Sequence, residues 1–432
     1  MTMVDERADG SGATHPVASD GTVLGVVAAV AAAFLVFGLA VDRPATLLAG
    51  LSAILTARDT LITDYIGVGG MGAAFVNAGL LTLVACLIYW RAGVKMTGGA
   101  VAALLLTLGF ALFGKNLVNV WPIIAGVFLY ARVRGEAFAA HANTAFFGCA
   151  LAPIFSEILF STTMPLSATL PLGLATGLVI GFVLVPVAAQ LFKAHMGFSL
   201  YNMGFAAGIL GTLVVALYRS YGFVPEPVFI WTRGNNLLLG VFLFVLFAAL
   251  AGYGLYRDRS AALSGFRAIL GMSGQAPADF IAAAGFGAAL VNMAAAGALG
   301  TAYLLLVGGD LNGPTIGAIL TIVGFAAAGK HVRNVLPVMA GVFIGTLAKP
   351  WNAHDPSLQL AALFGTTLAP IAGRFGWHWG IVAGFVHSSA ALAVGDLHGG
   401  LVLYNNGFAA GLVASVLAPI ILAFERKKPE TG

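Results

Sequence analysis

Two lysines that directly follow glycines are the first candidates for binding chemistry in this chain. Lys115 is followed by Asn119, and the same arrangement returns in Lys330 and Asn334. A lysine amino group between two helices can bind an anion or a carbonyl oxygen, and an asparagine amide offers both donors and acceptors. These four residues are therefore predicted to bind substrate. The alternative is that the lysines only reach to an interface with water and anchor the ends of their segments.

A histidine, a tyrosine and an asparagine form a second pair of motifs. An imidazole, a phenol and an amide in one short segment can form a ladder of donors and acceptors for a polar solute. The glycines that follow permit close approach of the backbone, whereas a helix cap with an interfacial aromatic belt is the alternative. The predicted binding residues are His195, Tyr201 and Asn202 in one copy and His398, Tyr404, Asn405 and Asn406 in the other.

Asn77 and Asn292 lie at matching places in segments rich in glycine and alanine. A buried amide must find hydrogen-bond partners, so these side chains either line a solute path or tie neighbouring helices together. Both are retained as candidate binding residues.

Glu157 is the acid best placed inside an apolar run, and Arg374 stands at the equivalent place in the second copy. A lone carboxylate within a membrane segment is by default a hypothesis for a functional site. Glu157 is therefore predicted to couple transport to a proton or another cation. A salt bridge at the end of a helix is the alternative.

These motifs recur because the chain contains an internal duplication. Asp64-Tyr65 and Gly72-Ala73-Ala74 return, at one offset, as Asp279-Phe280 and Gly287-Ala288-Ala289. The same offset relates the two Gly-Lys motifs, and a slightly shorter one relates the two Tyr-Asn motifs. Long repeats in an apolar chain indicate a duplicated membrane transporter or channel.

The composition identifies an integral membrane protein. Hydrophobic residues make up 59% of the chain and charged residues only 9%, whereas roughly a quarter of the residues of soluble domains are charged. No nucleic acid partner is expected, because the net charge of +4 comes mostly from loops. Zinc-helix and nucleophile-elbow motifs are missing from the sequence, so we expect no enzyme, no cofactor and no metal site. The expected partners are the lipid bilayer and a small molecule or ion, and homo-oligomer formation stays open.

The expected fold is all-α and polytopic, with about 14 transmembrane segments in two homologous halves. Apolar segments around Pro122, Pro153, Pro337 and Pro370 are too short for a straight span and are predicted to be broken or re-entrant helices. The expected organisation is a disordered cytoplasmic tail at 1–21, a first membrane repeat at 22–217, a connecting loop at 218–236, a second membrane repeat at 237–424 and a basic cytoplasmic tail at 425–432.

The second half is predicted to be inverted relative to the first. Each half has an odd number of apolar segments, and equivalent loops exchange their charge: Lys193 in the first half is replaced by Asp396 in the second. Because basic residues favour the cytoplasmic side, this pattern places both termini in the cytoplasm.

The elements Thr63-Asp64-Tyr65, Leu151-Ala152-Pro153 and Tyr201-Asn202 resemble a bacterial inner-membrane family described only as a domain of unknown function. The resemblance extends from about residue 22 to 424 and implies a multi-pass protein of the inner membrane. In addition, Leu397–Gly400 and Tyr404–Gly407 carry a local, non-collinear similarity to the His-Gly-Tyr-Asn-Gly segment of urea transporters, which implies a small neutral polar solute.

Together these features predict a secondary carrier of a small polar or anionic solute, with its site at the interface of the two inverted repeats. A passive small-solute channel is one alternative. A membrane-embedded enzyme acting on lipid-linked substrates is a weaker one.

Overall fold

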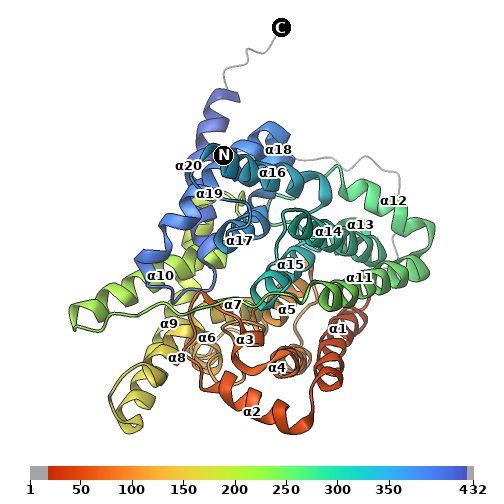
Figure 1. The fold of residues 1–432 in the computed structure, drawn as a ribbon. Helices are drawn as coiled ribbons and strands as arrows, with labels where there is room; N and C mark the ends of the chain where they lie inside the picture. Colours follow the sequence, from red (N-terminus) through yellow and green to blue (C-terminus); the bar gives the residue numbers. More distant parts are fainter. Residues whose placement is uncertain (1–17, 426–432) are drawn as a thin grey trace.

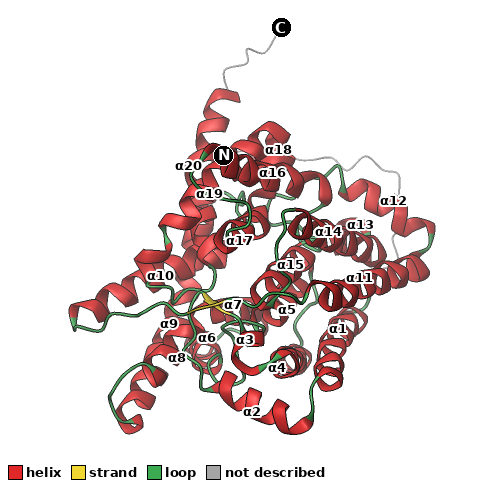
Figure 2. Cartoon of the chain, in the orientation of Figure 1, coloured by secondary structure: helices red, strands yellow, loops and turns green. Residues whose placement is uncertain are grey.

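The computed structural model describes residues 18–425, and its regular structure is almost entirely helical (Figure 2). The strands in this part are β1 (Ile62–Thr63) and β2 (Phe229–Ile230), which form one short parallel pair. The all-α prediction is confirmed. Apart from their inner ends, the predicted tails at 1–21 and 425–432 lie outside the described residues.

The helices of the first half follow one another with short connections. Their bounds are α1 (Asp20–Val41), α2 (Pro44–Leu55), α3 (Tyr65–Gly69), α4 (Met71–Ala92), α5 (Gly98–Phe110), α6 (Trp121–Arg134), α7 (Ala142–Gly148), α8 (Ala152–Phe160), α9 (Leu166–His195) and α10 (Asn202–Ser220).

The second half repeats this order of long and short helices. Their bounds are α11 (Asn236–Asp258), α12 (Ser260–Ile269), α13 (Phe280–Ala284), α14 (Phe286–Leu306), α15 (Gly313–Phe325), α16 (Val332–Ala348), α17 (Pro356–Gly365), α18 (Ala369–Phe375), α19 (Trp377–Ala393) and α20 (Asn405–Glu425). Across residues 18–425, nine helical stretches are long and apolar enough to cross a membrane, when α7 and α8 are counted as one stretch (Ala142–Phe160) and α19 is extended to His398.

The helix before each of the two lysines is short and ends in a loop. α5 and α15 have 13 residues each, fewer than the ~20 residues of a straight span. Irregular backbone, which carries Lys115 or Lys330, separates each of them from the next helix. Pro153 and Pro370 each lie in the first turn of a helix that follows a 3-10 turn. Proline is tolerated there because the first helical N–H groups have no partner within the helix.

The packing of helices is the same in both halves. α1 lies along α4 and α6 along α9, and the equivalent pairs are α11 with α14 and α16 with α19. The halves meet through equivalent helices, since α5 packs on α15 near the middle of the molecule and α10 packs on α20 (Figure 1).

The contacts between the two halves are reciprocal. Gly98 lies against the backbone of Ala327, and its counterpart Gly313 lies against the backbone of Leu112, the counterpart of Ala327. On the other pair of helices, Gly204 and Gly407 face each other directly. Small residues at these crossings let the backbones come close.

The crossing of α10 and α20 gives a stability prediction. A Cβ atom added at Gly204 would lie 2.8 Å from the Cα atom of Gly407, so Gly204→Ala must push the helices apart. We expect this overpacking to cost about 1–3 kcal/mol, measured as a lower melting temperature of the purified protein. Gly252→Ala in α11 is the control, because nothing lies within 4 Å of its added Cβ atom. Equal melting temperatures for the two variants would contradict the close crossing.

Candidate functional site: a pocket between the repeats

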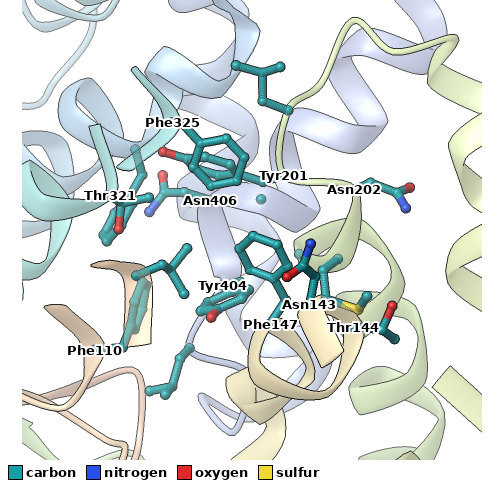
Figure 3. Close-up of a pocket in the computed structure, with 17 residues that line it drawn as sticks. Phe110, Asn143, Thr144, Phe147, Tyr201, Asn202, Thr321, Phe325, Tyr404 and Asn406 are labelled. Atoms are coloured by element: carbon teal, nitrogen blue, oxygen red, sulfur yellow. The ribbon is translucent and has the colours of Figure 1, made fainter. Parts of the chain in front are cut away.

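A cavity of about 240 Å³ lies where α10 and α20 meet α5, α7 and α15. Both repeats line it, and among the described residues no acidic side chain does. The lining side chains labelled in Figure 3 are Phe110, Asn143, Thr144, Phe147, Tyr201, Asn202, Thr321, Phe325, Tyr404 and Asn406.

Two helices begin at this pocket. Asn202 is the first residue of α10 and Asn405 the first residue of α20. The first N–H groups of a helix have no partner within the helix, and they give this end a partial positive charge. Because Gly204 lies against Gly407, both positive ends converge on one cavity.

Lys115 is fully buried behind the wall of the pocket. Its amino group donates to the hydroxyl of Tyr404 at 2.6 Å and to the carbonyl oxygen of Phe146 at 3.2 Å. The amino nitrogen also lies 4.9 Å from the centre of the Tyr404 ring, within the range of a cation–π contact. Thus a lysine of the first repeat is held by a tyrosine of the second.

Lys330 makes the reciprocal arrangement. Its amino group donates to the hydroxyl of Tyr201 and, at 2.7 Å, to the hydroxyl of Thr366. Within residues 18–425, neither lysine has a carboxylate at salt-bridge distance. Two amino groups without acidic partners therefore lie directly behind the two tyrosines of the pocket.

The four predicted asparagines near the lysines bond to the loops that carry the lysines and do not line the pocket. Asn77 donates to the carbonyl oxygens of Ala111 and Lys115, at 2.7 and 3.0 Å. Asn292 does the same for the equivalent loop of the second half. Asn119 and Asn334 each donate to the carbonyl oxygen of the glycine before the lysine, at 3.0 and 2.9 Å. These amides fix the irregular backbone from which the lysines extend.

The histidines position the starts of α10 and α20. The Nε2 atom of His195 lies 2.9 Å from Oδ1 of Asn202, and the equivalent pair His398 and Asn405 is 3.0 Å apart. Each asparagine also donates to a carbonyl oxygen of the preceding long helix. Neither histidine lines the pocket, whereas Asn202 does.

Asn406 lines the pocket and contacts a histidine of α19. Its Oδ1 atom lies 3.1 Å from Nε2 of His387. The first copy has no amide at this place, because Met203 occupies the equivalent position. The pocket is therefore asymmetric at this point.

Glu157 is not a lone carboxylate, so the premise of its predicted role is wrong. The Arg58 guanidinium donates to both of its oxygens, from Nη2 to Oε1 at 3.0 Å and from Nε to Oε2 at 3.3 Å. Arg58 could not be found from local spacing, because it lies in the loop after α2, far from Glu157 in the sequence. Neither residue lines the central pocket.

Sequence reasoning missed several pocket residues. Phe110 and Phe325 stand at equivalent positions just before the Gly-Lys motifs, so the duplication itself carried a signal for them. Asn143 and Thr144 have the apolar counterparts Leu360 and Ala361, and no repeated pattern marks them.

The exchange of partners between repeats predicts specific energetic coupling. Lys115→Met and Tyr404→Phe each remove one side of the same hydrogen bond. A double-mutant cycle should therefore show a coupling of about 1 kcal/mol or more in the free energy of unfolding. Lys349→Met combined with Tyr404→Phe is the control, because Lys349 bonds to Ser388 and Ser389 instead. Additive effects in both cycles would contradict the exchange.

Comparisons with known proteins agree with the duplication. The chain matches the family described as Protein of unknown function (DUF1576) over residues 43–220 and 258–423, one region in each half. Neither a curated protein nor a solved structure matches, and the local similarity to urea transporters gains no support. The match covers most of the sequence and follows its internal repeat, and the chain therefore belongs to the DUF1576 family of proteins of unknown function.

Proposed function

We propose that this protein is a secondary carrier of a small anionic solute, which binds in the pocket between the repeats. The observation that carries the proposal is the pair of buried lysines, Lys115 and Lys330: in the part of the chain that the structure describes, they have no acidic partners and the pocket beside them has no acidic side chain. Buried positive charge is costly unless something compensates it. A bound anion supplies that compensation.

The remaining walls favour an organic anion. The rings of Phe110, Phe147, Phe325 and Phe364 provide apolar contact, and Asn143, Thr321 and Asn406 provide hydrogen-bonding groups. Ligand pockets commonly combine apolar walls with a few placed polar groups. A cavity of about 240 Å³ suits a small carboxylate better than a lipid-linked substrate.

A row of cavities supports movement of the solute between the pocket and one face. A second cavity shares Phe364, Leu403 and Asn406 with the central pocket. A third cavity shares Leu61, Ile62 and Gly395 with the second, and Arg219 and Asp396 line it as well. In the inverted topology with cytoplasmic termini, these last residues face the outside.

Inverted repeats explain how the opposite face could open. If the two repeats exchange their conformations, access switches from one side of the membrane to the other while the site stays between them. The number of about 14 crossings, the bacterial inner membrane and the cytoplasmic location of both termini belong to this proposal. The lysine–tyrosine contacts are the links that such an exchange would rearrange.

A passive channel is the second candidate, because the same row of cavities could conduct without alternation. A channel gives flux that does not saturate and shows no counterflow. A carrier gives saturable uptake, and an inside pool of solute accelerates it.

Proteoliposomes test the proposal. With pooled labelled small carboxylates, we expect saturable uptake and counterflow by the unaltered protein and loss of both in Lys330→Met. Lys349→Met is the matched control, since its amino group bonds to Ser388, Ser389 and a carbonyl oxygen outside the pocket. Flux of urea without saturation, unchanged in Lys330→Met, would favour the channel and contradict the carrier. Failure of every anion to enter would refute the anionic substrate class.

A further inference from the structure

Asp59 is a fully buried carboxylate that lies outside the central pocket. It belongs to the loop between α2 and β1. Within residues 18–425, no lysine or arginine lies at salt-bridge distance from it. Burial of an unpaired carboxylate is costly unless it binds a cation or takes up a proton.

The groups that form hydrogen bonds with Asp59 all donate to it. Its Oδ2 atom accepts from Ser156 at 2.7 Å, from Asn119 at 3.0 Å and from Asn116 at 3.3 Å. Its Oδ1 atom accepts from the Tyr65 hydroxyl at 2.8 Å. Four donors therefore point at one carboxylate.

Backbone contacts determine which end of each amide faces Asp59. The Oδ1 atom of Asn116 accepts from the N–H groups of Val118 and Asn119, and the Oδ1 atom of Asn119 accepts from the N–H group of Asn116. Both amide oxygens are occupied, so both amides present N–H groups to the carboxylate. A metal cation needs oxygen ligands, and these two amides offer it none. The geometry of the amides thus favours a proton over a metal cation.

The two hydroxyl groups suit a site that changes its protonation state. A hydroxyl group can either donate or accept a hydrogen bond. When Asp59 is ionised, Ser156 donates to it. When Asp59 is protonated, its O–H can donate to Ser156, whose hydroxyl can then turn to the carbonyl oxygen one turn earlier in α8. Neither state leaves a polar group without a partner.

The charged and titratable groups that act on Asp59 are Glu157 from α8 and Tyr65 from α3, and Arg58 is the residue before it in the loop. Arg58 is already bound to both oxygens of Glu157. The Glu157 charge is thereby compensated, whereas that of Asp59 is not.

Only the first repeat contains this arrangement. Gly274 occupies the position equivalent to Asp59, next to the Asn334 amide, and Gly373 replaces Ser156. Phe280 replaces Tyr65. The frame is duplicated, but the carboxylate and both hydroxyl groups are present once.

The loop of Asp59 joins the proposed path of the solute. Thr60 and Leu61, the next two residues, line the outermost cavity of the row. On the other side, Asn119 donates both to Asp59 and to the carbonyl oxygen of Gly114, the residue before Lys115. Protonation of Asp59 would change its hydrogen bond with Asn119, and Asn119 supports the loop that carries Lys115.

We propose that Asp59, rather than Glu157, is the proton-binding carboxylate that couples this carrier to a proton gradient. The inference rests on the proposed transport function. The carboxylate takes a proton from water in the outer cavities. The neighbouring hydroxyl groups then change their hydrogen bonds, and no metal ion takes part.

Infrared difference spectroscopy of the purified full-length protein in lipid nanodiscs tests proton binding directly. Acidification should produce the carbonyl-stretch band of a protonated carboxylic acid. We expect Asp59→Asn to abolish this band and Ser156→Ala to shift it, because the serine hydroxyl bonds to that group. The band should remain in Glu157→Gln. It should also remain in Asp258→Asn, which removes a second buried carboxylate, one that accepts from the N–H group of Gly287. A band that survives Asp59→Asn, vanishes in Glu157→Gln or is missing from the unaltered protein would overturn the proposal.

Transport assays distinguish failure of this inference from failure of the proposed function. In proteoliposomes, Asp59→Asn should lose accumulation driven by a proton gradient and keep exchange of labelled carboxylate between two equal pools. If the unaltered protein exchanges carboxylate but ignores the proton gradient, the carrier stands and proton coupling fails. If it moves no carboxylate in either assay, the proposed function fails, and coupling through Asp59 fails with it.

Discussion

The burial of two lysine amino groups is the constraint on which the rest of this structure depends. An unpaired amino group in low-dielectric surroundings is costly, so each lysine must find partners. Lys115 finds Tyr404, and Lys330 finds Tyr201. Each tyrosine belongs to the opposite repeat, so each lysine takes one of its two partners from across the interface. The interface between the repeats is therefore built around the hydrogen bonds of these amino groups, and glycines such as Gly204 and Gly407 make the approach possible.

A symmetric frame with asymmetric side chains suits the proposed carrier. The lysines, tyrosines and converging helix starts are duplicated, which provides two equivalent ways to arrange the interface. Asn143, Asn406 and Asp59 have no polar equivalents in the other copy. In the proposal, the shared frame allows alternation, and the unshared side chains select the solute and the coupling proton.

Local patterns in the sequence located many of these side chains but not the partners of each one. The Gly-Lys and Tyr-Asn motifs do lie together, and their tyrosines line one pocket. In contrast, Asn77 and His195 bond to neighbouring helices and loops, which was the structural alternative for buried amides and helix caps. Glu157 looked isolated only because its partner Arg58 lies in a distant loop. The spacing of residues in the sequence indicates which side chains are neighbours along one helix. It does not indicate these contacts, because they join separate elements.

The sequence by itself determined the helical membrane class and the duplication. These depend on apolar composition and on repeated motifs, which are visible by comparison of the two halves. Only the tertiary structure decided that the lysine and tyrosine partners are exchanged between repeats and that Asp59 is buried among donors. The physical reason is that hydrogen bonds and burial depend on which distant segments pack together, and the packing of α5 on α15 and of α10 on α20 sets both.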